Sequence, residues 1–479
     1  MSLPLRFRQL HDHARAEPTV SWELRRDRLQ RLRHLLIRHK HDIAIAISQD
    51  FGNRSQHETQ FLEVFTSLQA IDHALAHGHI WMQPQSRHTS IWYKPARNIL
   101  LPQPLGVVGI ITPWNYPLLL TIGPLSCVLA AGNLAMVKLS EHTPAFGTLF
   151  DQLIRQSFSD DEIAIVNGDS SGDRSGDSGG NVALAQEFCA LPFDHLVFTG
   201  STAVGREVMR VASTNLTPVT LELGGKSPAI IGPSADFRHA VTRIISGKLL
   251  NAGQTCIAPD YVLLPKGREK AFIDCARDVV ARFYPSLNDE RLPTDDYTSI
   301  VNQRHYERLA ALCSDAQQHG AVLTPLSRRA PHASTRVLPP LAVTQAPADA
   351  RIMQEEIFGP LLPLVTYEKI GDAIATVNAG PRPLALYVFD KDSRIIDRVL
   401  QQTVSGGVTI NDTLLHIAQE DLPFGGVGAS GIGAYHGEEG FRRFSHMKPV
   451  FRQSRINAMR LFSPPYGKAF ALLMKLLIR

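Results

Sequence analysis

The sequence predicts an α/β protein that contains a doubly wound parallel sheet, a second α/β part and a small projecting hairpin. From Leu105 onward, short continuous apolar runs alternate with segments of helical periodicity. Continuous apolar strands are typical of parallel sheets that helices cover on both faces. The length of 479 residues is enough for two or three domains, each with its own core.

The elements before this alternation are expected to be helical and then extended. In residues 19–83, apolar positions recur every three or four residues, as they do in amphipathic helices. Residues 84–103 are bounded by prolines and alternate in SIWY and NILL. This pattern favours an extended hairpin that stands off the main body.

The alternation itself predicts the order of strands and helices. Five apolar runs are expected to be buried strands: LGVVGII, LAMVK, EIAIV, HLVFT and SPAII. Helices are expected between them, near residues 118–131, 143–158, 183–191 and 202–213. A second alternation occupies residues 235–425, with strands such as YVLL (261–264) and ALYVF (385–389).

Composition excludes several classes of function. Hydrophobic residues make up 44% and charged residues 20% of the chain, and the net charge of +4 is small, so no nucleic-acid partner is indicated. There are 19 histidines but no HExxH, and no metal site is expected. No run approaches the 18 or so apolar residues of a membrane-spanning helix. The stretch MSLPLRFRQLHDHARAEP has no secretory signal pattern.

Cysteine usage favours a reducing compartment and hence the cytoplasm. The five cysteines show no CxxC and no paired spacing. Four of them are expected to be inert thiols: Cys127, Cys189, Cys275 and Cys313. The fifth, Cys256, ends the stretch NAGQTC (251–256), whose small and amide-bearing residues allow a tight turn with the sulfur facing a cavity.

A carboxylate that can act together with this thiol lies 34 residues upstream, because Glu222 is part of LELGGKSP (221–228). A thiol at a tight turn and a carboxylate beside glycines are the groups that covalent chemistry on a carbonyl requires. The alternatives are an inert buried thiol for Cys256 and a structural ion pair for Glu222.

Asn115 is a candidate donor to an oxyanion. It lies in ITPWNYP (111–117), directly after the strand LGVVGII, and therefore at the edge where open α/β sheets bind ligands. A neutral amide N–H stabilises negative charge without competing for a proton. The alternative is that Asn115 caps the next helix.

Three further motifs are candidates for binding a dinucleotide. GSTAVG (200–205) follows HLVFT and opens a helix, whose free N–H groups suit a pyrophosphate. Lys138 and Glu141 in VKLSEHTP could bracket a ribose hydroxyl pair. In EEIFGP (355–360), Glu356 could bond a second ribose and Phe358 could pack on a nicotinamide ring. Each motif also has an alternative interpretation when taken singly. GSTAVG could be a plain helix start, Lys138 and Glu141 a surface ion pair, and EEIFGP a loop with a buried Phe.

All these motifs occur in the order of a known family. ITPWNYP, VKLSEHTP, FTGSTAVG, LELGGKSP, NAGQTC and EEIFGP are followed by NDT (411–413) and LPFGGVGASGIGAYHG (422–437). The chain therefore resembles the aldehyde dehydrogenase superfamily over most of its length. The short N-terminus, the hairpin and the PPYGK ending resemble its class 3 branch. DFGNRS, NAGQTCIAPDYVL and SPPYGK are most similar to coniferyl aldehyde dehydrogenases.

The resemblance implies the aldehyde dehydrogenase-like fold and a division of the chain. A Rossmann-type NAD(P)-binding domain would comprise residues 1–83 and 104–222, and an α/β catalytic domain residues 223–425. Residues 84–103 and 426–479 would form the oligomerisation hairpin and the C-terminal tail. A homodimer is expected, because the hairpin needs a place to bury its apolar face.

The resemblance also implies the reaction, which is the NAD(P)-dependent oxidation of an aldehyde to a carboxylic acid. Cys256 would attack the aldehyde carbon, and Asn115 with the backbone N–H of Cys256 would hold the oxyanion. Hydride transfer would leave a thioester, and Glu222 would activate the water that releases the acid. The substrate would be aromatic, such as coniferyl aldehyde, or a medium- or long-chain aliphatic aldehyde. The alternative is a thiol esterase or hydrolase that needs no cofactor.

The cofactor-binding residues that the family motifs imply are Ile111, Thr112, Trp114, Lys138, Glu141, Gly200, Ser201, Val204, Gly205, Leu223, Glu356 and Phe358. Among them, Glu141 should repel a 2′-phosphate because both groups are negative. The expected cofactor is therefore NAD⁺, although the class 3 branch often accepts NADP⁺ as well.

Three segments depart from the family pattern. GDSSGDRSGDSGG (168–180) is expected to be a tolerated surface loop without catalytic effect. Leu250 stands where many members have a Phe, which would reshape the substrate tunnel. The apolar tail AFALLMKLLIR (469–479) is too short to span a bilayer. Packing on the body or on a partner subunit is favoured over contact with a membrane surface.

Overall fold

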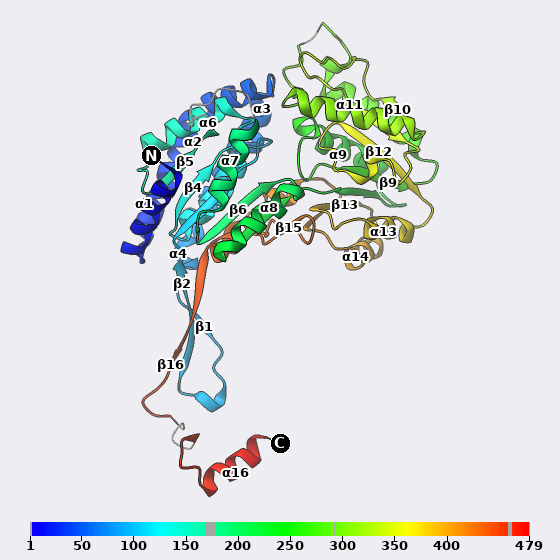
Figure 1. Ribbon diagram of the computed structural model, residues 1–479. Helices are drawn as coiled ribbons and strands as arrows, with labels where there is room; N and C mark the ends of the chain where they lie inside the picture. Colours follow the sequence, from blue (N-terminus) through cyan, green and yellow to red (C-terminus); the bar gives the residue numbers. More distant parts are fainter. Residues whose placement is uncertain (1, 169–177, 292, 458–461, 479) are drawn as a thin grey trace.

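The computed structural model describes residues 2–168, 178–291, 293–457 and 462–478. Within these residues, two helix-covered sheets form the body, and a long, narrow third sheet projects from it (Figure 1). The α/β fold class that the alternating apolar runs predict is confirmed.

The first sheet has six strands among the described residues, in the order β15-β7-β6-β3-β4-β5. Neighbours are parallel except for β15, which is antiparallel to β7. The strands are β3 (Val107–Ile111), β4 (Leu134–Lys138), β5 (Ile163–Val166), β6 (His195–Gly200), β7 (Val219–Leu223) and β15 (Gly431–Ile432).

Helices cover this sheet on both faces. They are α1 (Leu3–Ala16), α2 (Trp22–Phe51), α3 (Gln56–Thr59), α4 (Thr66–Trp81), α5 (Leu119–Ala130), α6 (Pro144–Ser157), α7 (Ser178–Cys189), α8 (Thr202–Ala212) and α15 (Gly437–Arg443), with the π-helical turn η1 (Gln60–Phe65) and the 3₁₀ turn η4 (Ser213–Asn215). In β3, Val108 and Ile110 share a core with residues of α2, α5 and α6, whereas Val107 and Ile111 share another with α1, α7 and α8. Burial on both faces explains why the strand is apolar at every position.

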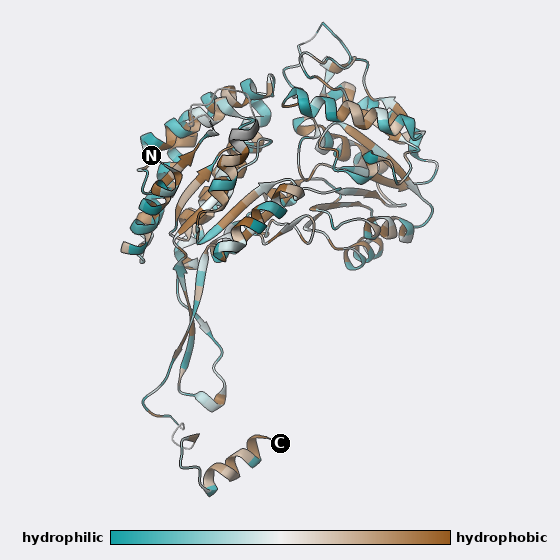
Figure 2. Cartoon of the chain, viewed as in Figure 1, coloured by the Kyte–Doolittle hydropathy of each residue, from teal (hydrophilic) through white to brown (hydrophobic). Residues whose placement is uncertain are grey.

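The second sheet has seven strands among the described residues, in the order β10-β11-β12-β9-β8-β13-β14, and only β10 runs antiparallel to its neighbour. Its strands are β8 (Pro228–Ile231), β9 (Tyr261–Pro265), β10 (Val322–Pro325), β11 (Leu341–Thr344), β12 (Leu361–Tyr367), β13 (Ala385–Phe389) and β14 (Gly407–Ile410). Its helices and turns are α9 (Phe237–Leu249), η5 (Leu250–Gly253), α10 (Glu269–Phe283), η6 (Pro285–Leu287), α11 (Gln303–Gln318), α12 (Arg351–Gln354), α13 (Ile370–Ala379), α14 (Ser393–Gln402) and η7 (Leu415–Ala418). The strands of both sheets are hydrophobic, and the helices present hydrophilic faces to the outside (Figure 2).

The third sheet joins the predicted hairpin to a strand near the C-terminus. β2 (Arg97–Pro104) pairs antiparallel with β1 (Gln85–Arg87) and with β16 (Ser445–Arg452). The sheet projects from the body, as the prolines and the alternation of residues 84–103 predict (Figure 1). Nearer the body, α15 packs on α4 and α5, so only part of residues 426–479 belongs to the projecting sheet and the tail.

Several local predictions were wrong. SPAII was grouped with the first alternation, but β8 lies in the second sheet beside β9 and β13, and β7 was not predicted at all. The stretch SIWY does not form a strand, since residues 91–93 form the 3₁₀ turn η2 (Ile91–Tyr93). In the insertion, residues 169–177 lie outside the described residues, and α7 begins at Ser178 rather than near residue 183.

The C-terminal segment does not pack on the body of its own chain. α16 (Lys468–Leu477) has no buried residue within the described structure, and Leu472 and Leu476 are exposed. It lies beyond the projecting sheet, where no other element of the described chain reaches it (Figure 1). Of the two packing surfaces predicted for this segment, the body of its own chain is therefore not used, and packing on a partner subunit stays a prediction. Across the described residues, no helix combines the length and the apolar character that crossing a membrane requires.

Candidate active site

Cys256 follows a turn of unusual backbone conformation. Asn251, Ala252 and Gly253 have φ angles of 52°, 51° and 77°, so three successive residues are left-handed just before the thiol. Left-handed backbone is costly for alanine and persists only where the surroundings enforce it. A Cβ on Gly253 would lie 2.4 Å from the carbonyl oxygen of Gly359. The turn is therefore fixed by close packing.

Hydrogen bonds also fix this turn. The N–H of Asn251 donates to Oε2 of Glu58 (3.0 Å), and its side-chain amide donates to the carbonyl oxygen of Asn115 (2.9 Å). The side chain of Gln254 donates to the carbonyl oxygens of Asn251 (3.0 Å) and Ser299 (3.1 Å). Sequence reasoning missed these polar residues as contributors, apart from their place in the NAGQTC motif.

The thiol borders a cavity of about 240 Å³. Nine of the predicted site residues line it: Trp114, Asn115, Gly200, Ser201, Glu222, Leu223, Cys256, Glu356 and Phe358. Cys256 is partly exposed there. The other predicted residues, Ile111, Thr112, Lys138, Glu141, Val204 and Gly205, do not border this cavity. They lie at the same edge of the first sheet or in α8, and β3 and β4 pair there with Ile111 opposite Lys138.

Asn115 is buried, and its side-chain N–H₂ group donates to the carbonyl oxygen of Gln254 at 3.2 Å. The alternative reading, that it caps the next helix, is wrong. The N–H groups of Leu118 and Leu119 instead donate to Oε2 of Glu63, at 2.8 and 3.2 Å. The amide of Asn115 is thus placed beside the turn that carries Cys256, where it can donate to an oxygen of a bound carbonyl compound.

A buried ion pair holds the loop that carries Asn115. Nη1 of Arg54 lies 2.8 Å from Oε1 of Glu63 and donates to the carbonyl oxygen of Asn115 at 3.0 Å. The guanidinium also stacks over the ring of Tyr116, 4.8 Å from its centroid. Arg54 and Glu63 are fully buried. Their burial could not be inferred from the sequence, because a charged residue in an amphipathic helical pattern is normally assigned to the solvent side.

Removing one member of this pair should destabilise the protein strongly. In Arg54→Met, Glu63 keeps its buried position without its cation, and breaking a buried pair in this way costs about 3–5 kcal/mol. Urea unfolding measures the loss. The double variant Arg54→Met/Glu63→Gln should recover part of it, because the glutamine oxygen still accepts from Leu118. A loss of less than about 1 kcal/mol, as is typical of exposed pairs, would contradict the prediction.

The burial of the cavity raises the pKa of both reactive groups, Cys256 and Glu222, which favours their protonated forms. Burial, and then the carboxyls of Glu356 and Glu222, raise the pKa of Cys256 to about 12, although the N–H groups of Cys256 and Ile257 oppose the shift. Burial raises the pKa of Glu222 well above its ordinary value, against the attraction of Arg443. Neither carboxyl oxygen of Glu222 has a hydrogen-bond partner among the described residues. A cation entering the cavity would favour the ionised forms of Cys256, Glu222 and Glu356.

The turn between β6 and α8 has the features of an anion seat. Ser201 is the N-cap of α8, and its hydroxyl accepts from the N–H of Val204 at 3.4 Å. A Cβ on Gly205 would lie 2.7 Å from the side chain of Leu223, so only glycine lets α8 pack this close to β7. Gly200 and Ser201 line the cavity, and the N–H groups at the start of a helix suit a phosphate group.

Lys138 and Glu141 lie at the end of β4. Nζ of Lys138 is 3.4 Å from Oε2 of Glu141. Lys138 is buried and Glu141 is exposed. Burial favours the neutral form of Glu141, but the attraction of Lys138, a backbone N–H and His142 together outweigh burial, and the pKa of Glu141 is lowered. The carboxylate therefore stays ionised, as an acceptor for sugar hydroxyls must.

Glu356 lines the same cavity as Cys256. Nζ of Lys226 pairs with Asp260 and donates to the carbonyl oxygens of Ile352 (2.8 Å) and Glu355 (3.0 Å), which fixes the loop before it. Burial, and then Asp260, raise the pKa of Glu356 to about 8. Its Oε1 has no hydrogen-bond partner in the described chain. An orphaned oxygen in a cavity fits a ribose hydroxyl donor, so the residues present suit a dinucleotide.

Phe358 is not the buried loop residue of the alternative reading. It is partly exposed, has a φ of 52°, and its ring meets Trp114 edge to face with centroids 5.3 Å apart. The strained backbone turns the ring toward the cavity, which suits contact with a flat heteroaromatic ring.

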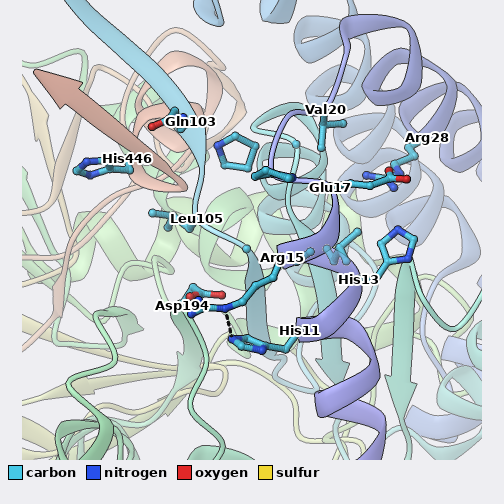
Figure 3. Close-up of a pocket in the computed structure, with 16 residues that line it drawn as sticks. His11, His13, Arg15, Glu17, Val20, Arg28, Gln103, Leu105, Asp194 and His446 are labelled. Carbon is cyan, nitrogen blue, oxygen red and sulfur yellow. Dashed lines mark hydrogen bonds between the residues drawn. The ribbon is translucent and has the colours of Figure 1, made fainter. Parts of the chain in front are cut away.

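Figure 3 shows another cavity, which lies between α1, the loop after it and the end of β2. Two arginines, Arg15 and Arg28, and two acids, Glu17 and Asp194, border it, so it has no strong preference for either charge. No predicted site residue belongs to its lining. In the described part of the chain, no group of three or more His, Cys, Asp or Glu side chains is arranged to hold a metal ion.

Comparisons with known proteins agree with the site. The aldehyde dehydrogenase family matches residues 11–450. The chain is 48% identical to the probable coniferyl aldehyde dehydrogenase of Pseudomonas aeruginosa, over 97% of this chain and 94% of that protein. It is 43% identical to the coniferyl aldehyde dehydrogenase of a Pseudomonas species, over 95% of this chain and 92% of that protein.

Solved structures show the same fold. The substrate-bound state of Staphylococcus aureus AldH superposes with a TM-score of 0.91 at 34% identity, covering 100% of both chains. A mutant aldehyde dehydrogenase C of Pseudomonas syringae in complex with NAD⁺ and octanal gives 0.81 at 26% identity, covering 94% of this chain and 89% of that one. The resemblance inferred from the motifs is confirmed. The chain belongs to the aldehyde dehydrogenase family, and it is an oxidoreductase that acts on aldehydes with a nicotinamide cofactor.

Proposed function

We propose that this enzyme oxidises aromatic aldehydes such as coniferyl aldehyde to carboxylic acids, with NAD⁺ as cofactor and Cys256 as nucleophile. The observation that carries the proposal is the convergence of Cys256, Glu222 and Asn115 on one cavity that also reaches the turn before α8. The names of the relatives at 43–48% identity support the aromatic substrate class.

The roles of the residues follow from their positions. The thiol of Cys256 loses its proton to solvent, and Sγ then bonds as the thiolate to the aldehyde carbon. The N–H₂ of Asn115 and the N–H of Cys256 donate to the aldehyde oxygen that becomes negative. When bound, the nicotinamide supplies the hydride acceptor that turns the thiohemiacetal into a thioester. Glu222 then takes a proton from the water that attacks the thioester carbon, and the thiolate of Cys256 leaves.

The same proposal assigns the cofactor contacts. The start of α8, with Gly200, Ser201, Val204 and Gly205, would hold the phosphates beside Leu223. The adenine-side ribose would lie against Lys138 and Glu141, near Ile111 and Thr112. Glu356 would accept from the nicotinamide ribose, and Trp114 with Phe358 would flank the ring. These assignments agree with an ionised Glu141 and with the orphaned Oε1 of Glu356.

Kinetics with both cofactors and an aldehyde panel test the function and the cofactor preference. We expect NADH formation with coniferyl aldehyde and cinnamaldehyde, and a kcat/KM for NAD⁺ at least about tenfold above that for NADP⁺, because Glu141 repels a 2′-phosphate. In Glu141→Gln this ratio should fall. Aliphatic aldehydes of six to twelve carbons are the comparison class. A higher kcat/KM for these than for the aromatic aldehydes would contradict the proposed substrate. A higher kcat/KM for NADP⁺ than for NAD⁺ would contradict the proposed cofactor.

The proposal includes a cytoplasmic homodimer. We assign residues 1–83 and 104–222 to cofactor binding, 223–425 to catalysis, and 84–103 with 426–479 chiefly to assembly. Apolar side chains at the end of the projecting sheet and on α16 are exposed in the single chain: Ile91, Trp92, Leu472 and Leu476. A partner subunit would cover them, and the surface of a membrane is the alternative for α16. Light scattering that gives the mass of one chain would contradict the dimer.

A further inference from the structure

The two proposed oxyanion donors come from segments of different sheets. Asn115 follows β3 of the first sheet, and the turn that carries Cys256 follows α9 and leads into β9 of the second. An aldehyde oxygen can accept from both donors only where the two segments keep a fixed distance. A misplacement of about 1 Å can cost about 10²-fold in rate, so the contacts that join these segments influence the reaction.

Side chains of the two segments join them directly. The amide of Asn115 donates to the carbonyl oxygen of Gln254 at 3.2 Å, and the amide of Asn251 donates to the carbonyl oxygen of Asn115 at 2.9 Å. The hydroxyls of Tyr116 and Thr255 lie 2.8 Å apart. An amide N–H₂ group can donate twice, so Asn115 can serve both Gln254 and an aldehyde oxygen.

Glu58 in α3 holds the Asn251 end of these contacts. Its Oε2 accepts from the backbone N–H of Asn251 at 3.0 Å and from the hydroxyl of Thr298 at 3.3 Å. Asn251 has a φ of 52°, a conformation that the surroundings must enforce. Glu58 lies 193 positions before Asn251 in the sequence, and the proposed mechanism gives it no role.

The negative charge of Glu58 does not explain its position. A carboxylate beside this turn disfavours an oxyanion, because like charges repel. Burial raises the pKa of Glu58 to about 7, against the attraction of Arg54. A carboxyl oxygen can accept a hydrogen bond in either protonation state. What Glu58 contributes is therefore an accepting oxygen at a fixed place.

We propose that Glu58 is a positioning residue for the oxyanion site. By holding Asn251, it sets the distance between the amide of Asn115 and the N–H of Cys256. The inference rests on the roles that the proposed function gives to these two donors. Glu58 itself does not border the cavity that contains Cys256. The reach of the side chain at position 58 should therefore matter for the reaction, and its charge should not.

Two variants separate reach from charge. Glu58→Gln keeps the length and an accepting oxygen without the charge, whereas Glu58→Asp keeps the charge on a side chain one methylene shorter. Arg54 retains its partner Glu63 in both variants. The measured quantity is the rate of NADH formation in a single turnover, with saturating NAD⁺ and enzyme in excess over coniferyl aldehyde, a step that precedes the action of Glu222. We expect Glu58→Gln to keep the wild-type rate and Glu58→Asp to lose about tenfold or more.

The loss should concern the oxyanion donors and leave the thiol unaffected. Alkylation by iodoacetamide needs the thiolate but forms no oxyanion, so Cys256 should be alkylated in Glu58→Asp at the wild-type rate. Asn115→Ala, which removes one donor, should lose about 10²–10³-fold in the single turnover. Because Glu58 acts through the same donors, Glu58→Asp should cost less in the Asn115→Ala background than in the wild type.

Asp296→Asn is the matched control, because it removes an exposed acid within electrostatic range of Glu58. It should keep the wild-type rate. Thermal unfolding shows whether each variant is folded. If Glu58→Asp is not, Thr298→Val replaces it, because it removes the hydroxyl that orients the carboxyl and should slow the single turnover without slowing alkylation.

A Glu58→Asp enzyme with the wild-type rate overturns the inference. So does a loss in Glu58→Gln as large as that in Glu58→Asp, or a parallel loss of alkylation. If the wild type does not oxidise coniferyl aldehyde, the proposed substrate class has failed instead, and octanal serves for the same comparison. If Asn115→Ala keeps the wild-type rate, the proposed role of Asn115 has failed, and the inference fails with it.

Discussion

Replacing Cys256 with alanine is expected to abolish aldehyde-dependent NADH formation, with a loss of about 10⁴-fold or more in kcat, as for removal of other covalent nucleophiles. The expectation rests on position, because Cys256 is the cysteine that borders the cavity with Asn115 and Glu222. Cys127 and Cys189 are buried within cores of the first sheet. The rate of NADH formation with a saturating aldehyde measures the loss.

The matched control is Cys275→Ala, which removes a partly exposed thiol from α10, a helix of the second sheet. It should retain wild-type activity. A Cys256→Ala enzyme that still forms NADH at a rate near that of the wild type would exclude the covalent mechanism and the roles assigned to the residues around Cys256.

The same thiol should react slowly with iodoacetamide when the cofactor is absent. Its pKa of about 12 means that little thiolate exists at neutral pH, and only the thiolate is nucleophilic. Because the thiolate fraction rises with pH, alkylation of Cys256 should accelerate about tenfold per pH unit below this pKa. NAD⁺ should accelerate it at fixed pH, because the positive nicotinamide favours the thiolate. Peptide mass spectrometry distinguishes Cys256 from the other four cysteines.

The reactive groups could be predicted because their signals are local. Cys256 is preceded by residues that permit a tight turn, and Glu222 is flanked by glycines. Seven strands of the two sheets (β3, β4, β5, β6, β8, β9 and β13) could be predicted, because burial on both faces leaves only apolar residues. The assignment of SPAII to a sheet could not, because β8 and β7 are close in sequence and their separation is decided by pairing with β9 and β13. No periodicity within one segment contains that information.

The charged residues that hold the Asn115 loop and the turn before Cys256 could not be predicted, for a different reason. Arg54, Glu58 and Glu63 are charged residues in helical or turn segments, and the normal rule places such residues at the surface. Their burial depends on partners that are distant in sequence, as when Arg54 meets Asn115 across 61 positions. Likewise, the proximity of Glu420 and His436 could not be predicted from the sequence, because only the folded chain brings both to the lining of one cavity.

Replacing Glu222 with glutamine is expected to stop the release of the acid while leaving the attack by Cys256 possible. The amide cannot take a proton from water, and losing a general base typically costs about 10²–10⁴-fold. A burst of NADH of at most one equivalent per site should therefore precede a very slow steady state. Mass spectrometry of the quenched protein should find the acyl group on Cys256. A steady state at the wild-type rate, or the absence of any acyl adduct after a burst, would contradict the role.

The pH dependence of this step has a definite sign. Glu222 acts as a base only when ionised, and burial raises its pKa, so the release of acid should speed up as the pH rises through that raised pKa. The glutamine variant should lose this dependence. A wild-type profile that is flat down to the ordinary pKa range of a glutamate would exclude Glu222 as the base.

The burial that raises the pKa of Glu222 also lowers the stability of the folded state at a pH where the carboxyl is ionised in the unfolded chain. Its pKa is higher in the folded chain than in the unfolded one, so above the unfolded value the unfolded state binds fewer protons, and stability falls as the pH rises toward the folded value. The isosteric glutamine has no proton to lose. Glu222→Gln should therefore melt at a higher temperature than the wild type at neutral pH, and the difference should shrink below the unfolded pKa of the glutamate. A variant that loses both activity and stability at neutral pH would point to a structural role for the carboxyl, whereas activity lost and stability gained is the signature of a residue kept for its chemistry.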